Sequence, residues 1–267
     1  MIKLIATDLD NTLLDKSSRI PDDTLAVIHE VVDSGVLVAV ATGRSFHSAN
    51  HVADLISPDA PVICYNGSLI KDASDNILYE AYVDFDLVRE IVSWAHENDV
   101  YVQLYDDDVI VVETLRTNRH PDPDLKFTEY REVGDLLAVE PFRTPKMLLA
   151  APPERIPGLQ AELEKRYRGF LFFAQSDSHL IEVMPSGVDK GAALRRLAEI
   201  EGVDISETMA LGDNTNDILL LKASGFAVAV NNAVPQLKAI ADYVCDGERS
   251  EGVSEAMKKF VLCDDPE

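Results

Sequence analysis

Two short segments of this 267-residue chain each hold a pair of aspartates at a spacing that can do chemistry. Asp8 and Asp10 lie in "DLDNT", and Asp213 and Asp217 lie in "GDNTND", each directly after an apolar run. If these segments meet, four carboxylates crowd together, and their repulsion would raise some of their pKa values sharply. A hard divalent cation with oxygen ligands relieves this repulsion, and Mg²⁺ is the usual ion in such sites. The acids therefore predict a Mg²⁺ site.

A small set of cations and neutral donors accompanies these acids. Lys190 opens an expected helix in "SGVDKGAAL", and Arg44 follows the segment "ATG". The hydroxyls of Thr12 and Thr42, the backbone at Gly43 and the N–H groups of helix starts add neutral donors. A metal ion, a lysine, hydroxyls and backbone N–H groups are what a phosphoryl group needs, because its transfer depends mostly on positioning and charge stabilisation.

The two acids of the first segment suggest separate roles in such a reaction. If Asp8 attacks phosphorus, an aspartyl-phosphate forms on its side chain. Asp10 would then donate a proton to the oxygen of the leaving group and later take a proton from water. The residues thus point to phosphoryl-transfer chemistry with a carboxylate nucleophile.

Apolar runs with the length of buried strands precede most of these residues. The expected strands are 2–7, 36–41, 61–66, 208–212, 226–230 and 242–245. Segments with helical periodicity and with start and stop signals lie between them, at 21–35, 188–202 and 214–225. Strand and helix in alternation predict right-handed βαβ units and a mostly parallel sheet. Ligands of such sheets bind outside the carboxyl ends of the strands, where the motifs "DLDNT", "TGRS", "NGS" and "GDNTND" stand.

The middle of the chain has a different pattern. Strand-like runs that look hairpin-paired occur at 101–114, 144–152, 170–175 and 178–185, and helical patterns occur at 86–98 and 154–167. Such a mixture predicts a smaller α+β domain inserted into the larger one. The expected architecture is therefore α/β, with a Rossmann-like core in 1–82 and 187–267 and an inserted domain in 83–186.

The overall charge restricts the partners of the chain. It has 24 Lys and Arg against 47 Asp and Glu, a formal charge of −23, which repels nucleic acid and anionic membranes. No stretch approaches the roughly 18 apolar residues of a membrane-spanning helix, and the start does not resemble a signal peptide. Cys64, Cys245 and Cys263 are far apart and form no CxxC, so we expect neither a disulfide framework nor a zinc site. A reducing cytoplasm is the expected location.

Four motifs occur along the chain in the order "DLDNTLL", "ATGRS", "VDKGAAL" and "GDNTNDILLL". In this order they resemble the four motifs of the haloacid dehalogenase-like (HAD) superfamily. The "NG" after the third strand, the large insertion and the tail "ADYVCDGERSEGV" resemble its Cof-like branch of capped sugar-phosphatase enzymes. The resemblance implies that 83–186 is an α/β cap that closes over the core, although the cap matches in pattern rather than in specific residues.

The resemblance also implies a role for each matching position. Asp8 would be the nucleophile and a Mg²⁺ ligand, Asp10 would be the acid/base and ligate the metal through its backbone carbonyl, and Asp213 would be the third ligand. Phosphoryl oxygens would be bound by Thr42, Gly43, Lys190 and Asn216. Asp217 would support the metal ligand Asp213, and Thr12 and Arg44 are further supporting residues. Many relatives have glycine at the position of Asn11, but asparagine tolerates unusual backbone angles, so we expect little consequence.

The reaction expected from the resemblance is Mg²⁺-dependent hydrolysis of a small phosphorylated metabolite, such as a sugar phosphate. Two alternatives remain open. A phosphomutase uses the same aspartyl-phosphate and needs a cationic clamp for a second phosphate, for which the inserted domain offers Arg116, Arg119, Arg131, Arg143 and Lys146. A phosphometabolite-binding regulator with residual activity is the other alternative, and the intact catalytic acids count against it.

Overall fold

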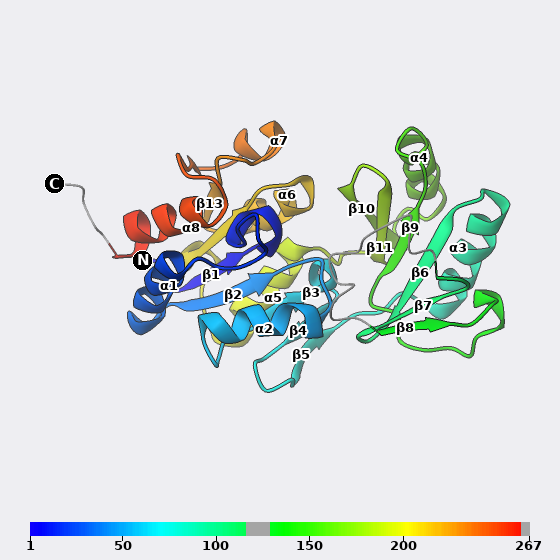
Figure 1. Ribbon diagram of the computed structural model, residues 1–267, viewed down its shortest axis with the longest axis horizontal. Coiled ribbons are helices and arrows are strands. Elements are labelled where there is room, and N and C mark those ends of the chain that lie inside the picture. The colour runs from blue at the N-terminus through cyan, green and yellow to red at the C-terminus, as the bar shows by residue number, and fades with distance from the viewer. Residues whose placement is uncertain (116–128, 263–267) are drawn as a thin grey trace. The chain divides into compact units, whose positions relative to one another are not determined.

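The computed structural model describes residues 1–115 and 129–262 (Figure 1). By their contacts, the residues form two compact units. Unit 1 comprises Met1–Gly43, Ala49–Tyr79 and Asp189–Glu267, and unit 2 comprises Arg44–Ser48 and Glu80–Val188. The sequence pattern gave no sign that Arg44–Ser48 would group with the inserted part of the chain. Within the described residues, every helix is too short or too polar to cross a lipid bilayer.

Unit 1 is built on an eight-stranded sheet with the order β14-β13-β12-β1-β2-β3-β4-β5 (Figure 1). Its strands are β1 (Leu4–Thr7), β2 (Leu37–Ala41), β3 (Val62–Cys64), β4 (Leu69–Lys71), β5 (Ile77–Glu80), β12 (Thr208–Gly212), β13 (Phe226–Ala229) and β14 (Tyr243–Val244). Neighbouring strands are parallel from β14 to β3, whereas β3 and β4 are antiparallel. The predicted α/β fold with a mostly parallel sheet is confirmed.

Helices follow most of the parallel strands of unit 1. They are α1 (Asp22–Asp33), α2 (Phe46–Ile56), α5 (Lys190–Glu201), α6 (Ile218–Ala223), α7 (Pro235–Lys238) and α8 (Arg249–Met257). Helix α1 packs against α8, and α5 packs against α6. The expected stop signals are present, because Gly35 (φ 90°) follows α1 and Gly202 (φ 67°) ends α5 in the left-handed region that favours glycine.

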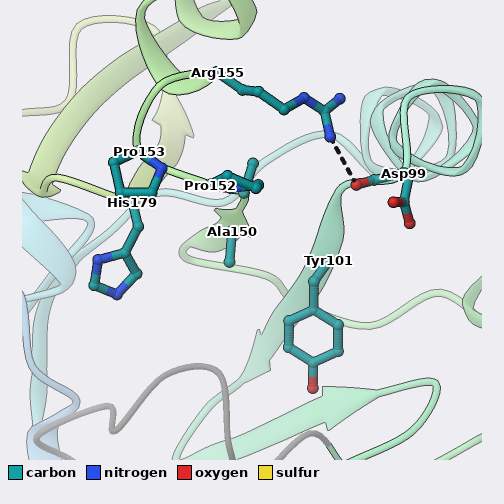
Figure 2. Close-up of a pocket in the computed structure, with 8 residues that line it drawn as sticks. Asp99, Tyr101, Ala150, Pro152, Pro153, Arg155 and His179 are labelled. Carbon is teal, nitrogen blue, oxygen red and sulfur yellow. Dashed lines mark hydrogen bonds between the residues drawn. The ribbon is translucent and has the colours of Figure 1, made fainter.

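Unit 2 contains a six-stranded sheet with the order β10-β11-β9-β6-β7-β8. The strands are β6 (Tyr101–Asp106), β7 (Val109–Val112), β8 (Glu129–Glu132), β9 (Met147–Ala150), β10 (Leu171–Asp177) and β11 (Leu180–Pro185), and the helices are α3 (Phe85–Glu97) and α4 (Ile156–Arg166). An apolar core that includes Trp94, Leu104 and Val183 joins the two helices to the sheet. A pocket opens at one end of this sheet (Figure 2).

The expected hairpins and both expected helices of the middle segment are present, but some short elements were not predicted. Strands β4 and β5 at the edge of the first sheet, and β8 in the second, have three or four residues each. Elements this short carry little periodic signal, because hydrogen bonding to a neighbouring strand rather than local pattern defines them. They do not alter the predicted fold class.

Candidate active site and metal centre

Asp8 stands at the end of a strand that is buried throughout. The four residues of β1 are all buried, and the backbone N–H of Asp8 donates to the carbonyl of Leu211 (3.0 Å), which extends the pairing with β12. The chain then leaves the sheet through a wide turn, Leu9–Leu13, in which Asn11 has φ 64°. Asparagine is among the residues that tolerate this left-handed conformation. The turn closes back through a hydrogen bond from the Leu13 N–H to the Asp8 carbonyl (3.2 Å).

The second acidic segment begins where the neighbouring strand ends. Strand β12 ends at Gly212, Asp213 follows, and a helical turn at Thr215–Asp217 folds back over this end. A Cβ on residue 212 would lie 2.6 Å from the Asp217 Cβ, so only glycine permits this fold-back. The Asp217 Oδ2 atom accepts hydrogen bonds from the backbone N–H groups of Asp213 (3.0 Å) and Asn214 (3.1 Å). Asp217 is thereby fixed against the end of β12.

Lys190 joins the two acidic segments. Its Nζ donates to Asp8 Oδ1 (2.6 Å) and to Asp217 Oδ1 (2.7 Å), and its side chain has no exposed surface. Lys190 is the first residue of α5, where the helix dipole disfavours a cation. Two carboxylates within hydrogen-bond distance outweigh this penalty, so the lysine is held by the site rather than by its helix.

Two glycines determine where the first turn of α5 lies. A Cβ at Gly67, in the turn after β3, would overlap the backbone oxygen of Asp189, the N-cap of α5. A Cβ at Gly191 would overlap the backbone oxygen of Leu219 in α6. The absence of both side chains lets the β3 turn and α6 approach the start of α5. This close packing directs Lys190 toward the carboxylates.

The charges of the site are strongly perturbed. Burial raises the pKa of Asp8 well above its ordinary value, opposed by Lys190 and reinforced by Asp217 and Asp213. Burial, and then the Asp217 carboxylate, raise the pKa of Asp213 to about 6, against the hydrogen bond from Thr12. Burial by itself would lower the pKa of Lys190, but Asp217 and Asp8 raise it above its ordinary value. One ammonium group therefore does not balance these carboxylates.

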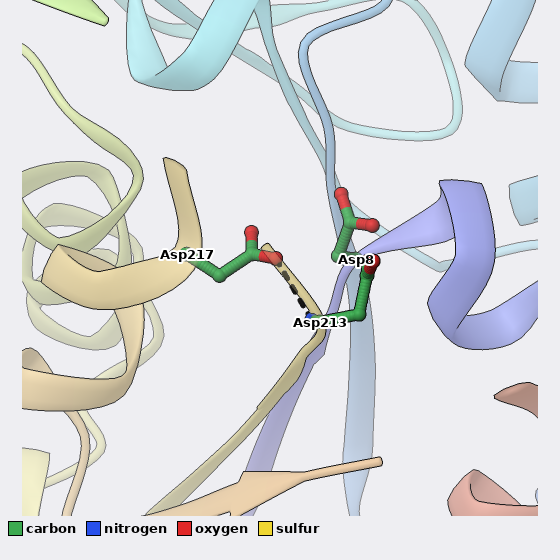
Figure 3. A group of neighbouring side chains, drawn as sticks. All are labelled: Asp8, Asp213 and Asp217. Carbon is green, nitrogen blue, oxygen red and sulfur yellow. Dashed lines mark hydrogen bonds between the residues drawn. The ribbon is translucent and has the colours of Figure 1, made fainter. Parts of the chain in front are cut away.

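The three buried carboxylates have the arrangement of a metal site. One oxygen each from Asp8, Asp213 and Asp217 lie within 4.8 Å of one another (Figure 3). Thr12 Oγ1 donates to Asp213 Oδ1 (2.9 Å) and so orients that carboxylate. An all-oxygen, anionic donor set suits a hard divalent cation. The residues present therefore fit the expected metal ion, and the buried acidic cluster could bind one.

Asp10 stands apart from this cluster. It lies in the turn after β1, is partly exposed, and its side chain is not a member of the buried carboxylate group. The sequence predicts that Asp10 ligates a metal through its backbone carbonyl and transfers protons with its carboxylate. Both roles stay predictions.

The other candidate residues follow neighbouring elements. Thr42 comes directly after β2, which pairs with β1, and its N–H donates to the Ile63 carbonyl (2.9 Å). At Gly43, a Cβ would lie 3.2 Å from Asn66 Oδ1, which is tight. Asn216 is half-buried in the turn that carries Asp217. Arg44 is buried in the segment that groups with unit 2. Binding of phosphoryl oxygens by Thr42, Gly43 and Asn216 stays a prediction.

Sequence reasoning missed one residue that supports the site. Asn232, in the loop after β13, donates from Nδ2 to the carbonyl of Asn11 (2.8 Å) and accepts from the N–H of Arg249 (2.7 Å). In the same loop, the N–H of Val234 donates to the Asp213 carbonyl (2.8 Å). The signal was present, because the polar pair "NN" follows the expected strand 226–230 as the other motifs follow theirs.

Comparisons with known proteins agree on one family. The model of the haloacid dehalogenase-like hydrolase family matches residues 5–257. The chain is 30% identical to an HMP-PP phosphatase of Yersinia pseudotuberculosis (89% of this chain, 87% of the relative). It is 27% identical to a 5-amino-6-(5-phospho-D-ribitylamino)uracil phosphatase of Bacillus subtilis (95% and 96%). A crystal structure of a haloacid dehalogenase-like hydrolase from Bacteroides thetaiotaomicron matches with a TM-score of 0.86 at 26% identity (97% and 99%).

Proposed function

The chain belongs to the haloacid dehalogenase-like hydrolase family and is a phosphatase of that type, and we propose that it hydrolyses small phosphate monoesters through an aspartyl-phosphate on Asp8. One observation supports this proposal above the others. The Asp8 carboxylate stands at a strand end, 2.6 Å from a fully buried lysine and beside two further buried carboxylates. A carboxylate held in this way is positioned to meet a phosphoryl group whose charge the surrounding residues stabilise.

The chemistry is a two-step transfer. Asp8 forms a bond to phosphorus while the bond between phosphorus and the leaving oxygen breaks, and Asp10 donates a proton to that oxygen. A water molecule then attacks phosphorus, Asp10 accepts its proton, and the bond to Asp8 breaks. Inorganic phosphate leaves, and both aspartates return to their starting states.

We propose Mg²⁺ as the metal ion, held by Asp8, Asp213 and the backbone carbonyl of Asp10, with Asp217 nearby. When bound, it neutralises charge on the carboxylates and on the phosphoryl oxygens. Lys190 adds a second positive charge next to the nucleophile, at 2.6 Å from Asp8 Oδ1. Thr42, Gly43 and Asn216 would hold the phosphoryl oxygens through hydroxyl, amide and backbone donors.

The substrate class follows by analogy with the named relatives. These are phosphatases of small phosphorylated metabolites, and the name of one of them contains uracil, a pyrimidine. We propose that the inserted segment 83–186 acts as the cap that selects the leaving group. We also propose the cytoplasmic location expected from the sequence, in which the three cysteines are far apart and form no CxxC.

Unit 2 gives a reason to prefer hydrolysis over the phosphomutase alternative. Of the five cations considered for a second phosphate, Arg116 and Arg119 lie outside the described residues. The other three each pair with a carboxylate, Arg131 with Asp106 (2.7 Å), Arg143 with Glu80 (3.2 Å) and Lys146 with Glu182 (3.2 Å). A clamp for a second phosphate needs cations that are not already neutralised.

The experiment that tests the proposal is turnover of p-nitrophenyl phosphate with Mg²⁺ and with EDTA, followed by borohydride trapping. Borohydride reduces an acyl phosphate, so trapped enzyme should carry homoserine in place of the Asp8 side chain, detected by mass spectrometry of the peptide. Turnover that depends on Mg²⁺ together with this product is the expected result. Turnover without any modification at position 8 would contradict the covalent intermediate.

A further inference from the structure

Unit 2 has a pocket of about 450 Å³ that the proposed catalytic chemistry does not use. It lies at one end of the six-stranded sheet, where β6 begins, β9 ends and β11 begins (Figure 2). Its lining includes Asp99, Tyr101, Ala150, Pro152, Arg155 and His179. The volume falls within the range of small-molecule sites, and apolar walls with a few polar groups are typical of such sites.

Strand register explains the shape of the pocket. Tyr101 pairs with Ala150 across β6 and β9, and Ala150 pairs with Leu180 across β9 and β11. Since neighbouring strands lie about 4.8 Å apart, Tyr101 and the turn that carries His179 stand about 10 Å apart, on either side of Ala150. In Figure 2 both rings point to the same side as the Ala150 methyl group. A small side chain between the two rings leaves a space that both rings border.

Both rings are held in place by hydrogen bonds. The Tyr101 hydroxyl donates to the carbonyl of Thr114 (3.1 Å), so the tyrosine is anchored at its far end. Nδ1 of His179 lies 2.8 Å from Oδ1 of Asp177, which fixes the plane of the imidazole. Rings that are fixed before a ligand arrives lose little conformational entropy on binding, which favours stacking against a planar partner.

Arg155 supplies a directed positive charge. Its guanidinium donates to the backbone carbonyls of Asp99 (3.4 Å) and Asn98, just beyond the end of α3. Within the part of the chain that the structure describes, no carboxylate forms an ion pair with Arg155. A guanidinium has five N–H donors, and these two bonds leave others for a ligand. Carboxylates outnumber cations in this chain of formal charge −23, so a cation without a carboxylate partner among the described residues is unexpected.

The sheet face that carries Tyr101 and Ala150 is polar beyond the pocket as well. In the next row, Gln103 is 3% exposed, and its Oε1 has no hydrogen-bond partner among the described residues. The same face holds the buried ion pair of Lys146 and Glu182. The opposite face forms the apolar core. A face used only for packing rarely retains an unsatisfied amide oxygen and a buried ion pair, whereas a ligand-binding face does.

We propose that this pocket binds a planar nitrogen heterocycle of pyrimidine or purine size, stacked on the Tyr101 and His179 rings with an acceptor edge toward Arg155. Stacking on aromatic side chains suits any heteroaromatic ring. Guanidinium N–H groups can donate to the carbonyl oxygens of a ring such as uracil or to the ring nitrogens of a ring such as adenine. The heterocycle is either a free small molecule or the ring of a substrate, and only the second case rests on the proposed function.

The binding test uses adenine and uracil as probes, titrated into the full-length protein by calorimetry and by saturation-transfer NMR. We expect saturable binding with a Kd on the order of 1 mM, which is typical for ligands of this size. Ala150→Leu fills the floor of the pocket, and Arg155→Gln removes its cation, so each should weaken binding at least tenfold. The absence of saturable binding by either probe would overturn the proposal.

Two matched variants separate the pocket from general effects on unit 2. Ala174→Leu adds the same side chain to another strand of the same sheet. Ala174 lies in β10, pairs with Glu182 of β11 and does not line the pocket. Arg166→Gln removes a cation from the exposed C-terminal end of α4, the helix whose N-cap residue is Arg155. Both controls should bind the probes as the wild type does. Equal weakening in the Ala150→Leu and Ala174→Leu proteins would overturn the assignment to the pocket.

Kinetics distinguish the two sources of the heterocycle. If the ring belongs to the substrate, Ala150→Leu raises KM for uridine 5′-monophosphate at least fivefold relative to ribose 5-phosphate, and uracil competes with the nucleotide. If the heterocycle is a free ligand, uracil binds but does not compete, and the ratio of the two KM values is unchanged. Both results support the pocket. A protein that binds the probes but hydrolyses no phosphate monoester would disprove the proposed function and leave this inference standing.

Discussion

The ammonium group of Lys190 lies 2.6 Å from the carboxylate of Asp8, although 182 residues separate the two in the chain. The same ammonium lies 2.7 Å from Asp217, so one buried cation serves two buried anions. In a region of low dielectric, the charges of these three groups depend on one another, and removal of the lysine leaves both carboxylates without compensation. The site is therefore more sensitive to loss of its cation than to loss of one of its carboxylates.

Lys190→Ala should lower both stability and activity. The change leaves Asp8 and Asp217 buried with no cation, and loss of one partner of a buried pair costs about 3–5 kcal/mol. Chemical denaturation measures the free energy of unfolding, and p-nitrophenyl phosphate turnover measures activity. Lys222→Ala, at an exposed position in α6, is the control and should change stability by no more than about 0.5 kcal/mol. A Lys190→Ala protein as stable as that control would show that the carboxylates are compensated in another way.

Asp8→Asn should abolish turnover and preserve the fold. Asparagine has the shape of aspartate but cannot act as a carboxylate nucleophile, and its neutral side chain reduces the repulsion with Asp213 and Asp217. We expect an unchanged circular dichroism spectrum, a melting temperature no lower than that of the wild type, and turnover at background. Asp23→Asn, on the exposed start of α1, should keep full activity. Retained turnover by Asp8→Asn would exclude this residue as the nucleophile.

The candidate site shows what a sequence can and cannot predict. Asp8 and Asp213 were predictable, because each is an acidic residue directly after a buried strand, and β1 and β12 are parallel neighbours. The direct contact of Lys190 with Asp217 was not predictable, since Asp217 was expected only to support the metal. That contact depends on how closely α5 approaches α6, and the positions of the glycines in the sequence do not give the distance between the two helices.

The elements missed in the fold have a related cause. The hairpin of β4 and β5 and the segment Arg44–Ser48 are short, and their positions depend on contacts with distant parts of the chain. Local propensity and periodicity describe long amphipathic segments well, as in α1 and α3, but carry little information over three or four residues. The parallel core was predictable because each of its strands is a continuous apolar run.

Addition of Mg²⁺ should raise the thermal stability of the wild-type protein. A cation bound only by the folded state stabilises it by about 2.7 kcal/mol when its concentration is one hundred times Kd. Asp213→Asn removes one of the three clustered carboxylates and should reduce the shift in melting temperature, whereas the exposed Asp22→Asn variant should retain it. Differential scanning fluorimetry with a Mg²⁺ titration measures this. An equal shift in the wild type and in Asp213→Asn would place the bound ion elsewhere.

Gly212→Ala should disable the site through Asp217 without changing any charged residue. The added methyl group would lie 2.6 Å from the Asp217 Cβ, and since β12 is central in the sheet, the side chain of Asp217 must move instead. Asp217 then loses its hydrogen bonds to the N–H groups of Asp213 and Asn214, and its contact with Lys190 weakens. We expect a fall in kcat of about tenfold to a hundredfold, on the scale of a displaced catalytic group.

The matched control for this variant is Gly158→Ala. Gly158 lies in α4 with no atom near the position of a Cβ, and alanine is the better helix former by about 1 kcal/mol. That variant should keep full activity and gain stability. If Gly212→Ala were as active and as stable as the wild type, the fold-back of Asp217 would not need glycine. The close approach at the end of β12 would then have no bearing on catalysis.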